Sequence, residues 1–487
     1  MTSIESAAAV VETHVSVVVF IGQRAYKVYK PLRLPFVDQS TAPKRFDLAW
    51  REVALNRRLA PDVYLGVLDV LRDGEAIDHL IEMVRMPPDR RLSTIVASGS
   101  GEEEVQAVAR KIAVFHEAAS ADSTEVGAAA SPEAITGLWE SSFAELEERR
   151  GDPLPADSLE AVTALARGYL AGRTALFRDR VRNGWARDGH GDLLADDIFC
   201  LDDGPRILDC LAFDDHLRHG DVLLDVAFLA MDLERLGRPE LARRFLDAYD
   251  EFTAERHPGS LAHHYVAYRA LVRCKVACLR ATQDPGGPAA DEARRLLSLC
   301  REHLEAARVR LVLVGGAPGV GKSTLARELS ARKGWVVLSS DELRKDLAGL
   351  GRTERRHEDL DEGIYSEQMS EVVYAELVRR AGELLAMGET VILDASWATA
   401  AQRALAEAAA KKHAADLVAI ECHAPPEVCH DRLVRRAEAG TDPSDATAAL
   451  APELAARRET WLAAAHVDTG GPLEGSLAAA EAMTGPA

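Results

Sequence analysis

Residues 189–210, GHGDLLADDIFCLDDGPRILDC, place several acidic side chains in a segment rich in apolar residues. Asp192 follows a histidine and a glycine, and Asp197 and Asp209 come 5 and 17 positions later. Carboxylate oxygens are the ligands that Mg²⁺ prefers, and a carboxylate can also accept the proton of an attacking hydroxyl group. These three acids could therefore support phosphoryl transfer, provided that the fold brings them together.

A second chemical pattern occurs at residues 316–323, GAPGVGKS, which match G-x-x-x-x-G-K-[ST] at every position. The pattern follows an apolar run that predicts a strand and precedes a predicted helix, which is the order that this phosphate-binding loop requires. Backbone N–H groups of such a loop surround phosphate oxygens, and the helix N-terminus adds a favourable dipole. Lys322 is expected to reach the β- and γ-phosphates and Ser323 to hold Mg²⁺. The predicted nucleotide-binding residues are Gly316, Gly319, Gly321, Lys322, Ser323 and Thr324.

The strands that follow this loop carry further polar residues at their ends. Asp394 ends the apolar run VILD, where an acid can hold the water shell of the metal. Here the chain resembles P-loop small-molecule kinases of the gluconate, shikimate and polynucleotide-kinase-like type. That resemblance implies that Asp341, in SSDELRKDL, activates the acceptor hydroxyl and that Arg344 grips the acceptor. The alternative is that Asp341 caps a helix and Arg344 is a surface residue.

An arginine-rich helix is predicted before the loop of residues 440–446. Arg432, Arg435 and Arg436 stand at positions i, i+3 and i+4 and so share one helix face. In the same kinases such a helix begins a lid, and the resemblance implies that its arginines cover the transferring phosphate. A solvated charged face is the competing interpretation. The segment around Asp468 and Thr469 is a candidate for the loop beside the adenine.

Three zones along the chain are expected to position these residues. Residues 14–85 predict the order β-β-α-β-β, and residues 91–300 are mostly helical by hydrophobic spacing. From residue 309 strands and helices alternate, which implies a parallel sheet with helices on both faces. The predicted domains are 1–300, with a β lobe at 1–90 and a helical lobe at 91–300, and 308–487.

The N-terminal domain resembles the aminoglycoside phosphotransferase and choline-kinase-like family over residues 14–280, at a few separated points. Lys27, in AYKVYK, lies on the second strand of a predicted hairpin, where kinases place the lysine that pairs with the α- and β-phosphates. Glu52 lies on the following helix and would orient Lys27 through an ion pair. Lys30 is the rival lysine, but it precedes Pro31 at the strand end.

The same resemblance assigns roles to the acids of residues 189–210. It implies that Asp192 accepts the proton of the acceptor hydroxyl or orients that hydroxyl, and that Asp209 binds the metal. It also implies that Asp225 braces the catalytic loop. Asp197 stands where the family has a metal-binding asparagine; it still offers an oxygen to Mg²⁺, but it adds a negative charge that could raise the pKa of Asp192.

Two other positions depart from the pattern of this family. No G-x-G-x-x-G precedes Lys27, so any turn that covers the phosphates must be short and polar. Ala212 is apolar where relatives often have an acid, so an acidic pocket for aminoglycosides is not supplied there. These departures bear on turnover more than on fold.

Composition limits the partners and the compartment. The 487 residues carry a formal charge of −20, which disfavours nucleic acid as a partner because its phosphates would be repelled. The start of the chain lacks a basic signal region, and no apolar run approaches the roughly 20 residues that span a bilayer. Seven cysteines without a CxxC pair predict reduced thiols in a cytoplasmic protein. Cys422, Cys429 and His430 lack a second ligand pair, so a zinc site there is disfavoured.

The whole chain resembles a bacterial family that joins an aminoglycoside-phosphotransferase-like domain to a P-loop kinase domain. The predicted fold is therefore multi-domain: an α+β bilobal protein-kinase-like fold, followed by an α/β P-loop nucleoside-triphosphatase fold with a parallel sheet. The resemblance implies two ATP/Mg²⁺ sites and transfer of a γ-phosphoryl group to a small hydroxylated acceptor. The alternative is a P-loop kinase or ATPase regulated by a kinase-like domain that binds nucleotide or metabolite without turnover. The identity of the acceptor and the oligomeric state stay open.

Overall fold

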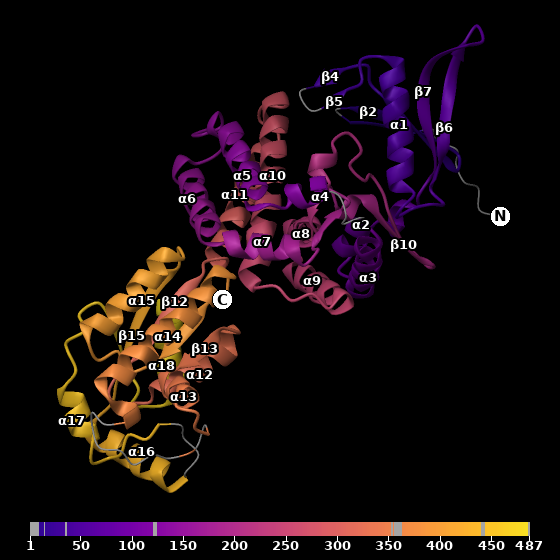
Figure 1. The fold of residues 1–487 in the computed structure, drawn as a ribbon. Helices are drawn as coiled ribbons and strands as arrows, with labels where there is room; N and C mark the ends of the chain where they lie inside the picture. The colour runs from indigo at the N-terminus through magenta and orange to yellow at the C-terminus, as the bar shows by residue number, and fades with distance from the viewer. Residues whose placement is uncertain are drawn as a thin grey trace. The chain divides into compact units, whose positions relative to one another are not determined.

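The computed structural model describes residues 9–13, 15–34, 37–119, 124–351, 354, 363–439 and 444–485. It divides into two compact units (Figure 1): the first is Met1–Ala156, Phe177–His257 and Tyr265–Cys300, and the second is Asp157–Leu176, Pro258–His264 and Arg301–Ala487. The predicted division was continuous. The compact units differ from it in two short segments, 157–176 and 258–264, which pack with the C-terminal part of the chain.

An antiparallel sheet of five strands begins the first unit, in the order β1-β2-β3-β7-β6. The predicted β-β-α-β-β order is present as β2 (Ser16–Ile21), β3 (Arg24–Tyr29), α1 (Ala42–Asn56), β6 (Tyr64–Arg72) and β7 (Glu75–Val84). The structure adds an edge strand, β1 (Ala9–Glu12), and a short pair, β4 (Arg33–Leu34) and β5 (Val37–Asp38). Helix α1 packs on β6 and β7, and its residues Ala49 and Val53 lie in one apolar core with Ala25 and Ile81 of the sheet.

The rest of the first unit is helical and contains two short strand pairs. Strands β9 (Ile198–Leu201) and β10 (Gly204–Ile207) form an antiparallel hairpin, and β8 (Ala186–Asp188) pairs with β11 (His219–Asp221). The loop with Asp192 therefore runs from β8 to β9. The helices between residues 92 and 306 are α2 (Leu92–Ala97), α3 (Glu102–Ala118), α4 (Thr124–Ala129), α5 (Pro132–Glu147), α6 (Ala156–Gly172), α7 (Thr174–Arg182), α8 (Val222–Arg235), α9 (Pro239–Thr253), α10 (Gly259–Gln283) and α11 (Ala289–Ala306).

The predicted parallel sheet of the second unit is present (Figure 1), and its five strands lie in the order β13-β14-β12-β15-β16. The strands are β12 (Arg310–Gly315), β13 (Val336–Ser339), β14 (Val391–Asp394), β15 (Asp416–His423) and β16 (Ala465–Asp468). Strand β12 is buried along its whole length, because β14 and β15 flank it and helices cover both faces. The helices are α12 (Lys322–Lys333), α13 (Ser340–Leu347), α14 (Glu367–Ala386), α15 (Ala400–Lys412), α16 (Pro426–Ala439), α17 (Ala451–Ala456) and α18 (Leu473–Thr484).

Alternating strand residues divide this sheet into two apolar faces. Val312 and Ile392 lie in one core cluster with Leu325 of α12 and Leu477 of α18. The intervening residues of the same strands, such as Leu313, are equally buried and point to the opposite face. The two faces leave the carboxyl ends of the strands at a single edge, where ligands of such sheets bind.

A buried arginine explains why residues 157–176 group with the second unit. Arg173, which follows α6, is only 1% exposed. Its guanidinium donates to the carbonyls of Leu385 and His413, each at 2.8 Å. These carbonyls lie at the C-terminal ends of α14 and α15, where the last carbonyls have no partner within the helix. One positive side chain therefore caps two helices of the second unit.

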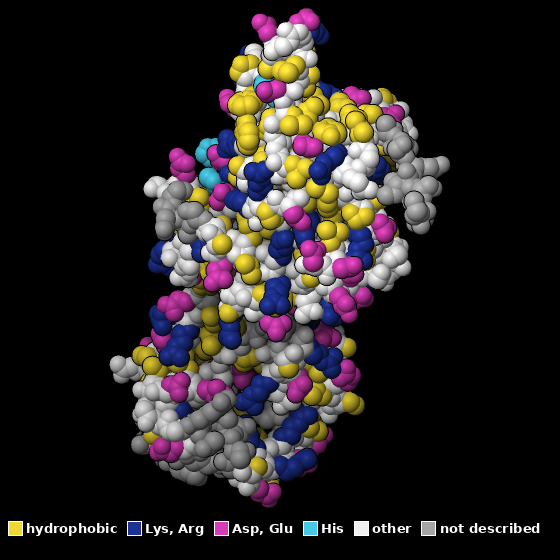
Figure 2. Space-filling view, turned by 90° about the vertical axis from the view of Figure 1, so that its right-hand side faces the viewer, with side chains coloured by type: hydrophobic (Ala, Val, Ile, Leu, Met, Phe, Trp, Pro, Cys, Tyr) yellow, Lys and Arg dark blue, Asp and Glu magenta, His cyan; other side chains and the backbone are white. Residues whose placement is uncertain are grey.

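Charged side chains of both signs cover the visible surface. In Figure 2 basic and acidic groups are interspersed over the face that is turned to the viewer, so the net negative charge does not form one acidic field there. Among the described residues, no helix combines the length and the apolar character that crossing a membrane would require.

Candidate functional site

The first candidate site joins three distant segments at the side chain of Lys27. Strand β3 carries Lys27, α1 carries Glu52, and Asp209 follows β10. The Nζ atom of Lys27 lies 2.9 Å from Oε1 of Glu52 and 2.8 Å from Oδ1 of Asp209. Tyr29 also donates a hydrogen bond to the buried Glu52. The structure therefore forms the ion pair between Lys27 and Glu52 and adds Asp209 to it, whereas Lys30 bonds the exposed Glu12.

Burial and charge set the protonation states of this group. Burial disfavours the charged form of Lys27, but Asp209 and Glu52 outweigh it and hold the pKa of Lys27 well above its ordinary value. The ammonium group of Lys27 lowers the pKa of Asp209. Burial raises the pKa of Glu52, with Lys27 opposing that shift. The site thus keeps a fixed positive charge next to an ionised Asp209, which suits phosphate and metal together.

The acids of the loop have unusual pKa values because they are buried close to one another. Burial, and to a smaller degree the negative charge of Asp209, raises the pKa of Asp192 to about 6, although Arg273 and Arg269 oppose the shift. Burial and the charges of Asp209 and Asp192 raise the pKa of Asp197 well above its ordinary value. Oxygen donors with mutual repulsion fit a hard divalent cation such as Mg²⁺, which would relieve that repulsion.

Asp225 of α8 fixes the loop that carries Asp192 through hydrogen bonds to the loop backbone. Its carboxylate accepts hydrogen bonds from the backbone N–H groups of His190 and Gly191 at 2.7 and 2.8 Å, and it lies 3.0 Å from Nε2 of His116. Burial would raise the pKa of Asp225, but the contact with His116 and its other partners lower it overall. A Cβ atom at Gly189 would lie 2.6 Å from that carboxylate, so the close approach requires glycine.

Sequence reasoning missed three residues around this loop. His116 of α3 bonds Asp225, and Arg269 and Arg273 of α10 influence the pKa of Asp192. Arg269 is 8% exposed, and its Nε donates to the carbonyl of Leu224 at 2.9 Å. The spacing of the two arginines, i and i+4 on one helix, was the available signal. The spacing alone does not show that this helix lies beside the loop; the fold does.

The second candidate site is the glycine-rich loop between β12 and α12. Gly316, Gly319 and Gly321 have φ values of 142°, 83° and 104°, which side chains rarely adopt. A Cβ atom at Gly316 would lie 2.7 Å from the carbonyl oxygen of Cys422, and one at Gly319 equally close to that of Cys429. The glycines are thus required both by conformation and by the approach of β15 and α16. Thr324 lies exposed in the first turn of α12.

The predicted metal ligands of this site come together at the sheet edge. Asp394 ends β14, the strand next to β12, and is 4% exposed. Burial raises its pKa, while the charge of Lys322 and a hydrogen bond from Ser323 oppose that shift. Lys322 lies at the loop, with Nζ 3.4 Å from the carbonyl of Ala317. Ser323 and Asp394 therefore present oxygens side by side where Mg²⁺ is expected.

Helix α13 holds Asp341 and Arg344 in different ways from those the alternative predicted. The N-cap residue of α13 is Ser339, so Asp341 lies inside the first turn and is not the cap. Arg344 is not on the surface: it is 7% exposed and donates to the carbonyl of Ile364 at 2.7 Å. Its guanidinium also lies 5.2 Å from the ring centre of Tyr365. Both features of the alternative interpretation are therefore wrong.

The three arginines of α16 have different surroundings. Arg432 donates to the carbonyl of Val320 in the glycine-rich loop at 3.0 Å and to that of Thr469 at 2.7 Å. Arg436 donates to the carbonyl of Ala446 at 2.7 Å, and Arg435 is exposed. The predicted lid loop includes 440–443, which lie outside the described residues. Arg432 thus links α16 to the glycine-rich loop.

These two sites define the class of protein: a P-loop domain joined to a unit with the arrangement of the protein-kinase-like fold. A family model described as AAA domain matches residues 311–460. Both halves resemble solved kinase structures. The APS kinase CysC of Mycobacterium tuberculosis, in complex with AMPPNP and APS, is 23% identical, with 36% of this chain and 98% of that chain covered and a TM-score of 0.28. A choline/ethanolamine kinase family protein from Mesorhizobium loti is 14% identical, with 62% and 89% covered and a TM-score of 0.39.

The aminoglycoside phosphotransferase APH(2")-IIIa in complex with GDP and kanamycin is 15% identical, with 62% of this chain and 94% of that chain covered and a TM-score of 0.41.

Whole-length relatives identify the family. Uncharacterized protein Rv2004c of Mycobacterium tuberculosis H37Rv and uncharacterized protein Mb2027c of Mycobacterium bovis are each 40% identical over 473 residues, which cover 96% of this chain and 93% of theirs. The chain belongs to the same family as these mycobacterial proteins.

Proposed function

We propose that the chain is an ATP- and Mg²⁺-dependent phosphotransferase with two nucleotide sites, which transfers a γ-phosphoryl group to a small hydroxylated acceptor. The sites correspond to residues 1–300 and 308–487, with 157–176 and 258–264 packed in the second unit. The observation that carries the proposal is the meeting of Glu52 and Asp209 at Lys27, because Asp209 lies 182 residues from Lys27 in sequence. A surface charge pair would not require a strand, a helix and the end of a distant hairpin to converge.

In the first site the residues divide the work of phosphoryl transfer. Lys27, held by Glu52, pairs with the α- and β-phosphates. Asp192 orients the acceptor hydroxyl and accepts its proton; a pKa of about 6 leaves it mostly ionised at neutral pH and still able to take up a proton. Asp225 keeps Asp192 in place through the loop backbone.

In the second site the glycine-rich loop holds the phosphates. The N–H groups of Gly319 and Gly321 face them, Lys322 contacts the β- and γ-phosphates, and Arg432 fixes the loop from α16. Asp341 is the candidate base for the acceptor of this site, and Arg344, which lies over the ring of Tyr365 on the same helix as Asp341, is the candidate residue that grips the acceptor.

Mg²⁺ would be held by Asp197 and Asp209 in the first site and by Ser323 and Asp394 in the second. When bound, it neutralises the charge that develops on the phosphate oxygens. Two protein oxygens per site are a suitable number, because Mg²⁺ keeps several waters and phosphate ligands of its own.

A second candidate function rests on Asp197. Its carboxyl group replaces an amide and has a raised pKa, which favours the protonated form and weakens the metal site when no nucleotide is bound. The first unit would then bind nucleotide or a metabolite without turnover and regulate the P-loop unit.

The experiment that separates the two functions measures ADP release by the full chain with a panel of hydroxylated metabolites. If both sites work, Asp192→Ala and Lys322→Ala each remove one part of the ATP turnover. If the first unit is regulatory, only Lys322→Ala does so. Asp197→Asn tests the metal site: a large gain in ADP release would show that the carboxylate limits turnover. Activity unchanged by Asp192→Ala would refute catalysis in the first unit.

A further inference from the structure

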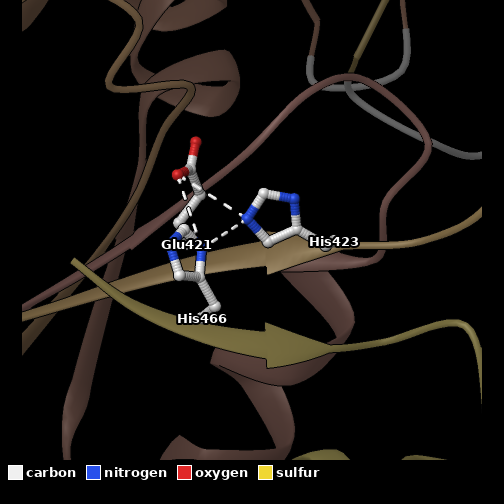
Figure 3. A group of neighbouring side chains, drawn as sticks. All are labelled: Glu421, His423 and His466. Carbon is white, nitrogen blue, oxygen red and sulfur yellow. Dashed lines mark hydrogen bonds and ion pairs between the residues drawn. The ribbon is translucent and has the colours of Figure 1, made fainter. Parts of the chain in front are cut away.

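Two strands of the second unit bring two histidines and a glutamate together at the carboxyl edge of the sheet (Figure 3). Glu421 and His423 are two positions apart at the end of β15, so their side chains point to the same face. His466 on β16 is the register partner of Glu421 in the parallel pair. The alternate residue, Cys422, points into the apolar core on the opposite face.

The three side chains lie at distances that a metal ion would span. Nε2 of His423 is 2.7 Å from Nδ1 of His466 and 3.6 Å from Oε2 of Glu421, and Nδ1 of His466 is 3.8 Å from that oxygen. Ligands of a tetrahedral zinc ion at about 2.0–2.1 Å are separated from one another by roughly 3.3 Å. The observed distances lie on both sides of this value, so shifts of the side chains by about half an ångström would place all three ligand atoms at the distances that a bound zinc ion requires.

A further contact orients the glutamate toward the histidines. Arg458 donates to Oε1 of Glu421 at 2.6 Å and to the carbonyl of Ser396 at 2.5 Å. Oε1 is thus occupied, and Oε2 is the oxygen that faces the two rings (Figure 3). In metal sites, the side chains that bind the ion are typically oriented by a hydrogen bond from a neighbouring group, as Arg458 does here for Glu421.

We propose that Glu421, His423 and His466 form a binding site for a transition-metal ion of the Zn²⁺ class, separate from the Mg²⁺ sites at the phosphates. Imidazole nitrogens select borderline ions such as Zn²⁺ over Mg²⁺, and two histidines with one carboxylate are a zinc ligand set. Among the described residues, this is the only group of three histidines, cysteines or acids whose ligand atoms lie within 4.8 Å of one another. It differs from the cysteine-based site that the sequence disfavoured, because Cys422 is buried on the other face.

The surroundings leave one coordination position open. The side chains of His423 and His466 are 55% and 64% exposed, and they border a surface hollow that Pro425 and Asp468 complete. Three protein ligands with an open position can bind water or an exchangeable ligand. The site adjoins the nucleotide loop, since the carbonyl of Ser396 also accepts the N–H of Gly316 at 3.3 Å.

Without metal, the short contact of the two histidines is explained by a hydrogen bond in which one ring is the donor. Titration of the full chain with Zn²⁺ alone, followed by calorimetry in a buffer free of nucleotide and Mg²⁺, separates the two explanations. We expect the wild type to bind Zn²⁺ at this site. We expect His423→Ala and His466→Ala each to weaken binding at least about tenfold, and the double variant to lose the site, because each removes one of three ligands.

His430→Ala is the matched control, since His430 is an exposed histidine on α16 outside the cluster. It should bind Zn²⁺ like the wild type. The two tested histidines are largely exposed, so their replacement should not prevent folding, and circular dichroism of each variant checks this. A wild type that fails to bind Zn²⁺, or variants that bind it as tightly and with the same stoichiometry as the wild type, would overturn the proposal.

Discussion

Replacing Asp192 by asparagine should inactivate the first site and at the same time stabilise the fold. The asparagine keeps the shape of the side chain but cannot accept the proton of the acceptor hydroxyl, which costs about 10²–10⁴-fold in rate. It also removes a carboxylate whose pKa is raised to about 6, mainly by burial. Because an acid with a raised pKa opposes folding at higher pH, its removal should increase the free energy of unfolding.

The size of this effect follows from the shift and depends on pH. In the unfolded chain Asp192 loses its proton near its ordinary pKa of 3.8, whereas in the folded protein it keeps the proton up to a pKa of about 6. At about 1.36 kcal/mol per pKa unit, the wild type is penalised by about 1.5 kcal/mol at pH 5 and by up to about 3 kcal/mol at pH 7.5. Well below the ordinary pKa of 3.8 both states are protonated and the penalty vanishes. Partial solvent contact makes these values upper limits.

Urea unfolding of the wild type and of Asp192→Asn at pH 5 and pH 7.5, without nucleotide and divalent cations, measures the difference. Asp47→Asn, on the exposed face of α1, is the matched control and should change the free energy of unfolding little. The reasoning would be refuted if Asp192→Asn destabilised the protein at pH 7.5, or if its effect were the same at both pH values. Either result would mean that the attraction of Arg269 and Arg273 stabilises the charged form of Asp192 by more than burial destabilises it.

Three further substitutions test other parts of the structure. Gly316→Ala should weaken ATP binding at the second site by at least about tenfold in a nucleotide titration, because its Cβ would lie 2.7 Å from the carbonyl of Cys422 and the backbone at φ 142° would be strained by about 1–3 kcal/mol. Arg432→Ala removes two charged hydrogen bonds, one to Val320 of the glycine-rich loop and one to Thr469, and should also weaken ATP binding about tenfold, while the exposed Arg435→Ala should leave it unchanged. Equal effects of the two arginine variants would show that charge, and not the contact, matters. Arg173→Ala leaves buried helix-end carbonyls without their donor and should destabilise the second unit by about 2–4 kcal/mol in thermal or urea unfolding, with ATP affinity kept; an unchanged midpoint would show that water replaces the guanidinium.

Local patterns made most of the second unit predictable. The glycine-rich loop, its strand and its helix are contiguous, so residues 310–333 contain the whole signal. The parallel sheet followed from strands alternating with helices. The register did not follow: nothing in the separate segments shows that Glu421 pairs with His466, and a register change of one residue would have moved either side chain to the other face.

The sequence alone determined the phosphate-binding loop, the alternation of strands and helices in the second unit and the spacing of the acids at residues 189–210, because these depend on short-range patterns, and its resemblance to known kinases supplied the fold of the first unit. Only the tertiary structure decided that Asp209 joins the ion pair of Lys27 and Glu52, and that Arg269 lies near Asp192. It also decided that Arg173 caps two helices of the second unit. Such contacts join residues far apart in the chain, and they form only where the packing of buried faces brings those residues together, so local spacing carries no record of them.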